Sequence, residues 1–187
     1  MLDYDIYIFP HFNTFELVTI DDATIERVQS FVSNLINVKL SEGHHKKDGG
    51  MEYKRWMNGI LGECAVEKYI DKKFVDLSIG DSSKYHIPDM SSLGIQCGIK
   101  TVEIGKFPII FKTPTTPEVI VIRESKHDFY ICGVATIAVL NEFQSDGLVV
   151  SESLRRRGTK TAFYGFGNLI SPLKLKKRFT NAIHSTN

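Results

Sequence analysis

Apolar residues recur at helical spacing in two stretches of the chain, and both stretches predict amphipathic helices. Asp21 and Asp22 precede the first stretch, where acids suit the positive end of a helix. Its apolar positions are Ile25, Val28, Phe31, Val32, Leu35 and Ile36. The second helix is predicted over about Glu52 to Ile70, with an apolar face of Trp56, Met57, Ile60, Leu61, Ala65 and Tyr69.

Glu63 lies on the packed side of this second helix, one turn after Ile60 and two turns after Trp56. Gly59 and Gly62 are awkward neighbours, since each costs a helix interior about 1 kcal/mol relative to Ala. Such glycines usually have a packing or functional reason. We therefore expect another backbone segment to approach the helix closely near Glu63.

The middle of the chain changes to the short apolar runs of β-strands, separated by glycines and polar turns. We expect one mixed sheet, a hairpin turn at 125–128, a further helix starting within 136–143 and a loop over 41–50. An additional first strand is predicted at Asp3 to Ile8. The strands of the middle region are expected at 74–77, 85–90, 95–103, 107–112, 118–123 and 129–134.

Bulk properties indicate one globular domain over residues 1–187, and the predicted helices and strands make it an α/β domain. The chain has 42% hydrophobic and 24% charged residues, a normal balance for a folded protein. It has no apolar stretch of membrane-spanning length and no basic signal-peptide start, so we expect a cytoplasmic protein without a membrane partner. Cys64, Cys97 and Cys132 lie far apart in apolar surroundings and are expected to be core residues.

The near-zero net charge hides a basic C-terminal region, residues 150–187. It holds eight Lys or Arg against one acid, which leaves 15 basic and 21 acidic residues in the rest of the chain. A basic region on an acidic body favours a polyanionic partner such as DNA, although a solvated segment would look similar. The candidate DNA-binding residues are Arg155, Arg156, Arg157, Lys160, Lys174, Lys176, Lys177 and Arg178.

Three polar residues follow one another on helix, strand and strand in an order that resembles a known enzyme family. They are Glu63 in GILGECAVEKYI, Asp89 in YHIPDM and Lys100 in GIQCGIKTVEIGKFPII. This order is similar to that of the PD-(D/E)xK, or restriction-endonuclease-like, nucleases over about residues 52–134. The resemblance implies a mixed central sheet flanked by helices and the activity of a Mg²⁺-dependent DNA endonuclease. It also makes a homodimer an expected assembly, because family members that cut both DNA strands commonly act as dimers.

The chemistry of phosphodiester cleavage explains why such residues would gather. A hard cation held by carboxylate oxygens activates water and stabilises the extra charge on phosphate. Glu63 and Asp89 are the expected Mg²⁺ or Mn²⁺ ligands. Lys100 is expected to orient or deprotonate the water. Each residue also has a structural explanation: a polar helix edge, a common Pro-Asp turn, and a strand lysine that covers apolar surface.

The chain departs from the family at Gly98, where the acid two residues before the lysine is missing. If the strand continues through this segment, Gln96 shares a face with Lys100 and can offer a neutral oxygen. The resemblance also implies that the Ile99 carbonyl is a metal ligand. A carboxylate from elsewhere is a further alternative, and Glu103, Glu118 and Glu124 are the candidates.

Other features support weaker hypotheses. Phe163, Tyr164 and Phe166 lie among the basic residues and are either base-stacking or core residues. His44, His45 and Asp48 suggest a metal site less than they suggest a solvated loop. The rival functions are a catalytically inactive DNA-binding or protein-interaction module, and an unrelated α/β protein such as a phage or defence accessory protein.

Overall fold

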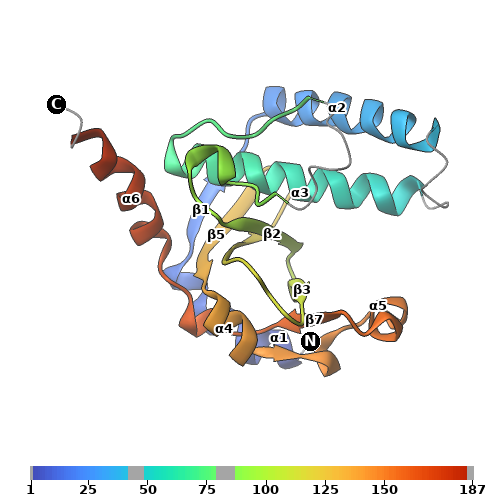
Figure 1. The fold of residues 1–187 in the computed structure, drawn as a ribbon, viewed down its shortest axis with the longest axis vertical. Helices are drawn as coiled ribbons and strands as arrows, with labels where there is room; N and C mark the ends of the chain where they lie inside the picture. Colours follow the sequence, from blue (N-terminus) through green and yellow to red (C-terminus); the bar gives the residue numbers. More distant parts are fainter. Residues whose placement is uncertain (1, 42–48, 79–86, 185–187) are drawn as a thin grey trace.

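The computed structural model describes residues 2–41, 49–78 and 87–184, which form three layers (Figure 1). Helices α2 (Asp22–Ser41) and α3 (Gly49–Ile70) form the first layer. A four-stranded mixed sheet forms the second. A small antiparallel sheet lies on the other side of it, together with α1 (Leu2–Tyr7) and α4 (Ile137–Glu142). The fold is therefore an α/β arrangement with helices packed on a mixed sheet.

The main sheet has the strand order β1 (Glu16–Thr19), β5 (Asp128–Ala135), β4 (Glu118–Arg123) and β2 (Gly98–Glu103). Its pairs are antiparallel except β2 and β4, which run parallel with Gly98 opposite Glu118 and Lys100 opposite Ile120. Successive residues of a strand face opposite sides. Val119 and Val121 accordingly pack in the core beneath the helices, whereas Ile120 and Ile122 belong to the core shared with the small sheet.

The expectation of one sheet was wrong. The chain leaves β2 through a turn at Gly105, whose φ of 82° suits glycine, and β3 (Ile109–Phe111) then joins a second sheet. That sheet has the order β3, β7 (Lys160–Phe163) and β6 (Gln144–Ser145), all antiparallel. Ile110 of β3 is buried in the core shared by the two sheets, called the lower core below, so the chain passes from one sheet to the other beside apolar residues.

The N-terminal strand prediction was also wrong, because residues 2–7 form α1. Tyr4 and Ile8 are both buried while Ile6 is 59% exposed, as expected for residues four and two apart on a helix. In so short a segment, the same sequence also fits the alternating pattern of a strand. Strand β1, further along, was not predicted. No strand forms at 74–77, where the N–H groups of Phe74 and Val75 bind the Glu67 carboxylate instead of a neighbouring strand.

Several other predictions are confirmed. Both long helices form, β4 has the predicted bounds, and the turn before β5 connects an antiparallel pair. Thr136 caps α4, since its hydroxyl accepts from the Val139 N–H at 3.3 Å. All three cysteines are buried and free. Of the predicted loop at 41–50, residues 42–48 lie outside the described part, while residues 41, 49 and 50 belong to helices.

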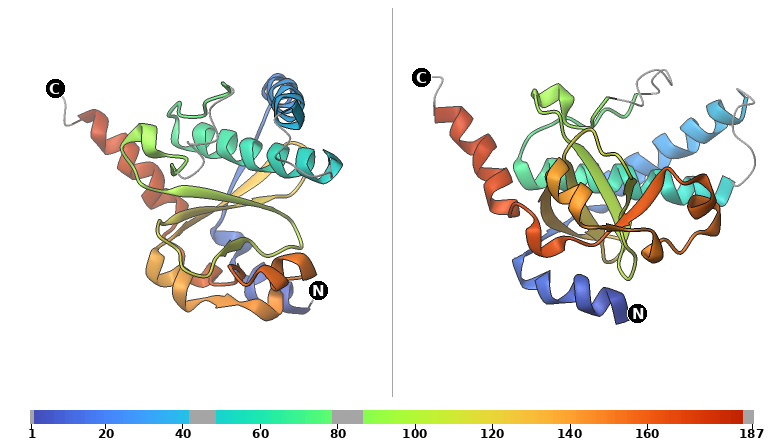
Figure 2. Two further views of the ribbon diagram at one scale, coloured as in Figure 1. Left: turned by 45° about the vertical axis from the view of Figure 1, so that its right-hand side comes forward. Right: turned by 60° about the horizontal axis from the view of Figure 1, so that its bottom comes forward.

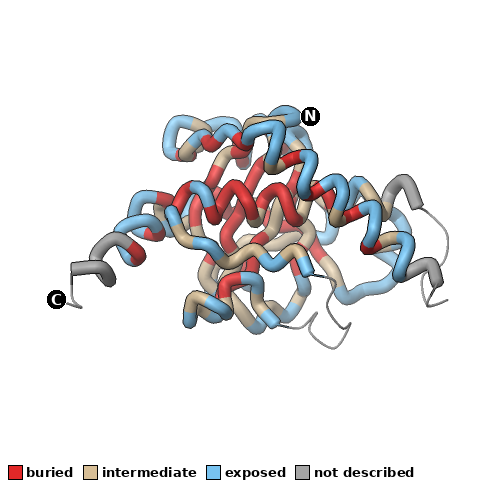
Figure 3. Tube along the Cα trace, turned by 90° about the horizontal axis from the view of Figure 1, so that it is seen from above, coloured by how far each residue is buried: buried red, intermediate tan, exposed pale blue. Residues whose placement is uncertain are grey.

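Two helices from the basic C-terminal region complete the fold, α5 (Glu152–Arg157) and α6 (Pro172–His184). Figure 2 shows them at opposite ends of the molecule. Buried residues are concentrated at the centre of the trace in Figure 3, and α6 contributes Leu175 and Phe179 to that core. Within residues 2–41, 49–78 and 87–184, no helix is long and apolar enough to cross a membrane.

Candidate active site

Helix α3 packs on the edge strand β2, and Glu63 directly follows the residue that meets this strand, Gly62. A Cβ atom added to Gly62 would overlap the side chain of Thr101 on β2, so a close approach occurs at this glycine, but it is made by a side chain and not by backbone as predicted. Gly59 has no such neighbour within 4 Å, and close packing does not explain it. Glu63 is half-buried and next to the point of closest contact between helix and strand.

Asp89 lies in a tight turn that runs beside the free edge of β2, not at a strand end as predicted. Residues 87–90 of the predicted strand 85–90 form this turn, and residues 85 and 86 lie outside the described part. Met90, which is fully buried, anchors the turn and its N–H donates to the Cys97 carbonyl at 3.1 Å. The Asp89 carboxylate oxygen Oδ2 accepts from the Ile99 N–H at 2.6 Å. The turn is therefore fastened to β2 one residue before Lys100.

The place of the missing acid at Gly98 is filled from the neighbouring strand. A Cβ at residue 98 would overlap Oε2 of Glu118, whose residue is paired directly with Gly98. The Glu118 side chain is 12% exposed, and its Oε1 lies 3.6 Å from Nζ of Lys100. Its Oε2 is buried and has no hydrogen-bond partner among the described residues. A carboxylate thus lies beside the lysine, as in the family pattern, but it comes from β4.

The other two acids suggested as replacements are used elsewhere. Glu103 is bound to Lys54 at 2.8 Å and to Lys106 at 2.6 Å. Glu124 is exposed and accepts from the Tyr130 hydroxyl at 3.3 Å. Neither carboxylate lies beside Lys100 as Glu118 does.

Electrostatic interactions connect the predicted residues around the β2 edge. Burial, together with the negative charge of Asp89, raises the pKa of Glu63 to about 8, against the opposing effect of Lys100. Desolvation also raises the pKa of Asp89, although the residue as a whole is exposed, because its carboxylate lies against the protein. The pKa of Glu118 is raised by burial as well, against the effect of Lys100.

These groups reach the edge from different directions. Lys100 and Glu118 lie on the face of the sheet that is turned toward the small sheet, because Val102 and Ile120 on that face belong to the lower core. Glu63 comes from the helical layer on the opposite face, and Asp89 lies at the edge between them. No group of three or more His, Cys, Asp or Glu side chains within the described ranges is arranged to hold a metal ion as it stands.

The backbone and side chain predicted as additional ligands have different positions. Ile99 has its N–H bound to Asp89, on the side away from β4, and N–H and C=O of one strand residue point to the same side. Its carbonyl is therefore directed toward the open edge, next to Asp89. Gln96 precedes β2, so the alternation that would turn it toward Lys100 does not apply. It is exposed and lines a different cavity beside α6.

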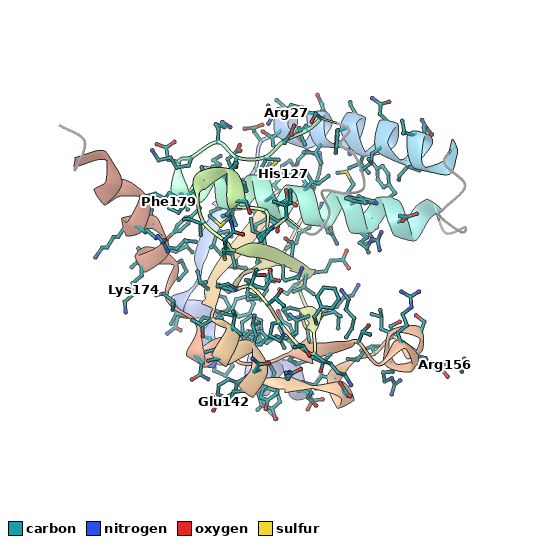
Figure 4. All side chains as sticks on the ribbon, in the orientation of Figure 1. Arg27, His127, Glu142, Arg156, Lys174 and Phe179 are labelled. Atoms are coloured by element: carbon teal, nitrogen blue, oxygen red, sulfur yellow. The ribbon has the colours of Figure 1, made fainter. Side chains whose placement is uncertain are left out.

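The basic residues do not form one surface. Figure 4 shows Arg156 of α5 and Lys174 of α6 on opposite sides of the molecule. Arg155, Arg156 and Arg157 are exposed on α5, and Arg156 is paired with Glu152 at 2.6 Å. The second group, on α6, comprises Lys174, Lys176, Lys177 and Arg178.

Lys160 belongs with the candidate site more than with either group. It is half-buried on β7 with Nζ 3.8 Å from the centroid of the Phe111 ring. Burial lowers its pKa, and the positive charges of Lys100, Arg55 and Arg157 lower it further. Positive charge therefore extends from Lys100 through Lys160 to the C-terminal end of α5.

The idea that aromatic residues of this region stack on bases was wrong for two of the three. Phe163 is fully buried and Phe166 is 3% exposed, and both pack in the lower core. Tyr164 packs against Tyr7 and Phe143. Of the weaker metal hypothesis, His44, His45 and Asp48 lie outside the described residues.

Comparisons with known proteins show no relative of the chain. No protein-family model matches the sequence, and neither a curated protein nor a solved structure shows a significant match to it.

Proposed function

We propose that this protein is a divalent-metal-dependent nuclease of the restriction-endonuclease-like type, which hydrolyses DNA phosphodiester bonds at the edge of β2. The observation that carries the proposal is the position of Glu118. Its carboxylate fills the space above Gly98 and lies beside Lys100, where the resembled pattern needs an acid. Glu63 and Asp89 lie within electrostatic range of each other and of Lys100.

The chemistry of the acids suits a hard cation such as Mg²⁺ or Mn²⁺. The Glu118 oxygen Oε2 is buried without a hydrogen bond, which is costly for an anionic oxygen unless a cation approaches it. Desolvation raises the pKa values of Glu63, Asp89 and Glu118, and a bound divalent cation would favour the charged form of each. These three side chains and the Ile99 carbonyl would hold the ion.

Each residue then has a defined role in hydrolysis. A bound divalent ion would supply Lewis-acid stabilisation of the phosphate and lower the pKa of water. Lys100 orients the attacking water and offsets negative charge that builds on the phosphate. The water gives up a proton as its oxygen forms the new P–O bond, the bond to the leaving deoxyribose oxygen breaks, and that oxygen takes up a proton. Lys160 and the arginines of α5 would hold the flanking DNA backbone.

A second candidate function is a binding module without catalysis, and two observations favour it. The three acids are not arranged as a ready metal site, and Asp89 and Glu118 are already engaged with Ile99 and Lys100. In that case, the chain would bind DNA or a protein but not Mg²⁺. Calorimetric titration with Mg²⁺ and Mn²⁺ distinguishes the two candidates directly.

The decisive experiment for the nuclease is cleavage of plasmid and single-stranded circular DNA with Mg²⁺, with Mn²⁺ and with EDTA. Lys100→Ala should lower the rate by roughly two to four orders of magnitude. Lys126→Ala is the matched control. This exposed lysine pairs with Asp22 and lies in the turn that follows β4, at the opposite end of the strand from Glu118. Cleavage in EDTA, or equal rates for the two variants, would contradict the proposal.

A further inference from the structure

A cavity adjoins the candidate active site on the side of α6. Its volume is about 350 Å³, and its walls include Ile95, Gln96, Pro117, Ile170, Lys174 and Arg178. Two of these residues are chain neighbours of the site, since Gln96 lies two residues before Gly98 and Pro117 immediately precedes Glu118. The cavity is therefore next to the place where the scissile phosphate would lie.

The cavity combines apolar walls with positive charge at one side. Lys174 and Arg178 are one turn apart on α6, so both project from the same face of the helix. Both are exposed, and neither forms an ion pair with an acid in the described part of the chain. The buried side chains of Leu175 and Phe179 anchor the helix to the core, so the backbone that carries Lys174 and Arg178 is fixed relative to the cavity.

The opposite wall offers what a nucleobase requires. Ile95, Pro117 and Ile170 supply apolar contact, and the Gln96 amide can both donate to and accept from a base edge. The volume falls in the range of small-ligand pockets, which is large enough for one nucleotide and too small for a base pair with its two backbones. A paired base keeps its edge in the duplex and cannot enter such a cavity.

We infer that this cavity is a subsite for one unpaired nucleotide of the substrate strand, with its phosphate on Lys174 and Arg178 and its base against the apolar wall beside Gln96. The inference rests on the proposed nuclease function and narrows its substrate to DNA with single-stranded or frayed character. It also separates the basic residues by role: those of α6 that line the cavity bind one nucleotide, while those of α5 follow the backbone.

The test is a binding measurement by fluorescence anisotropy in EDTA, with a labelled 12-nucleotide single strand and a labelled blunt hairpin duplex as probes. Lys174→Ala and Arg178→Ala should each weaken single-strand binding about tenfold, as expected for a charge-assisted contact with phosphate. Lys177→Ala is the matched control, because it removes the same charge from α6 at a residue that does not line the cavity. Its effect should stay below about twofold.

Gln96→Trp supplies a second variant without a change in charge. The side chain is exposed at the cavity, so the protein should fold normally while the indole blocks the base site. Single-strand binding should fall about tenfold and duplex binding should be unchanged. Equal losses for Lys174→Ala and Lys177→Ala, or unaltered binding in Gln96→Trp, would overturn the inference.

The outcome is separable from that of the nuclease proposal. If plasmid is cleaved in Mg²⁺ but the cavity variants bind the single strand like the parent, the nuclease stands and the subsite fails. If no DNA is cleaved but the cavity variants lose single-strand binding selectively, the subsite stands on a protein that binds DNA without cutting it.

Discussion

Replacing Glu118 with glutamine isolates the feature on which the candidate site depends. The substitution keeps the shape of the side chain and removes its charge. In the metal-free protein, a buried charged oxygen without a hydrogen bond costs about 1–3 kcal/mol, and the Lys100 ammonium 3.6 Å from the other oxygen offsets part of that cost. Glu118→Gln should therefore leave the metal-free protein as stable as the parent or more stable by about 1 kcal/mol.

The response to metal should change in the opposite direction. A ligand at 100 times its Kd stabilises the folded protein by about 2.7 kcal/mol, which corresponds to a rise in Tm of about 5–10 °C for a chain of this size. The parent should show this rise in Mg²⁺ or Mn²⁺, and Glu118→Gln should show less than half of it. Glu124→Gln is the matched control, because Glu124 is an exposed acid that follows directly after the last residue of β4.

Moving the acid back to β2 tests the register of the two strands. Gly98 and Glu118 are directly paired, and their side chains would point to the same face. Gly98→Glu alone should destabilise the protein and fail to strengthen metal binding, because its Cβ would overlap the Glu118 carboxylate and add a like charge. The double variant Gly98→Glu, Glu118→Gly removes that overlap and should recover most of the metal-dependent rise in Tm.

Differential scanning fluorimetry and calorimetric titration of the parent and the four variants measure these effects. A parent protein whose Tm does not respond to Mg²⁺ or Mn²⁺ would refute the metal site. Equal responses in the parent and Glu118→Gln would show that Glu118 is not a ligand, even if a metal binds.

Three other predictions concern the helix α3 and the basic residues. The pKa of Glu63 is raised from 4.5 to about 8, so between these pH values the folded state binds a proton that the unfolded state has lost. The stability of the parent should therefore fall as pH rises from about 4.5 to about 8. Thermal melts of Glu63→Gln should show a weaker dependence of Tm on pH over this range. Gly62→Ala should destabilise by about 1–3 kcal/mol because its Cβ meets Thr101, while Gly59→Ala in the same helix should stabilise by about 0.5–1 kcal/mol, as urea unfolding would measure. Neutralising the arginines at 155–157 together should make the slope of log K against log salt concentration for duplex binding shallower by up to about three units, without altering sequence preference. An unchanged slope would show that these arginines do not contact the DNA.

The sequence predicted the elements whose pattern is long or bounded by clear turns. The two helices are long enough for the 3.6-residue period to be unambiguous, and the strands β4 and β5 flank a turn with Ser125 and Asp128. Short segments failed, because six residues at the N-terminus fit either period. The division into two sheets was not predictable, since a strand pattern states that a residue is extended but not which strand it pairs with.

The acid of the candidate site was beyond prediction for a related reason. Glu118 lies 20 positions after Gly98, and only the parallel pairing of β2 with β4 brings the two together. The sequence offered Glu118 only as one of three alternative acids, and its spacing indicated none of them. The absent side chain was the available signal: a buried strand residue without a Cβ indicates that some other group occupies the space beside it.

The position of β2 at the edge of the sheet explains how groups from two faces can serve one centre. In an interior strand, the N–H and C=O groups on both sides are used by neighbouring strands. On β2, the Ile99 N–H is free to bind Asp89, and the Ile99 carbonyl is directed to the same open side. Glu63 arrives from the helix above this edge, and Lys100 with Glu118 from the face below. Asp89 and Lys100 therefore interact electrostatically with Glu63 on one side of this edge and with Glu118 on the other, an arrangement that an interior strand of the same sequence could not provide.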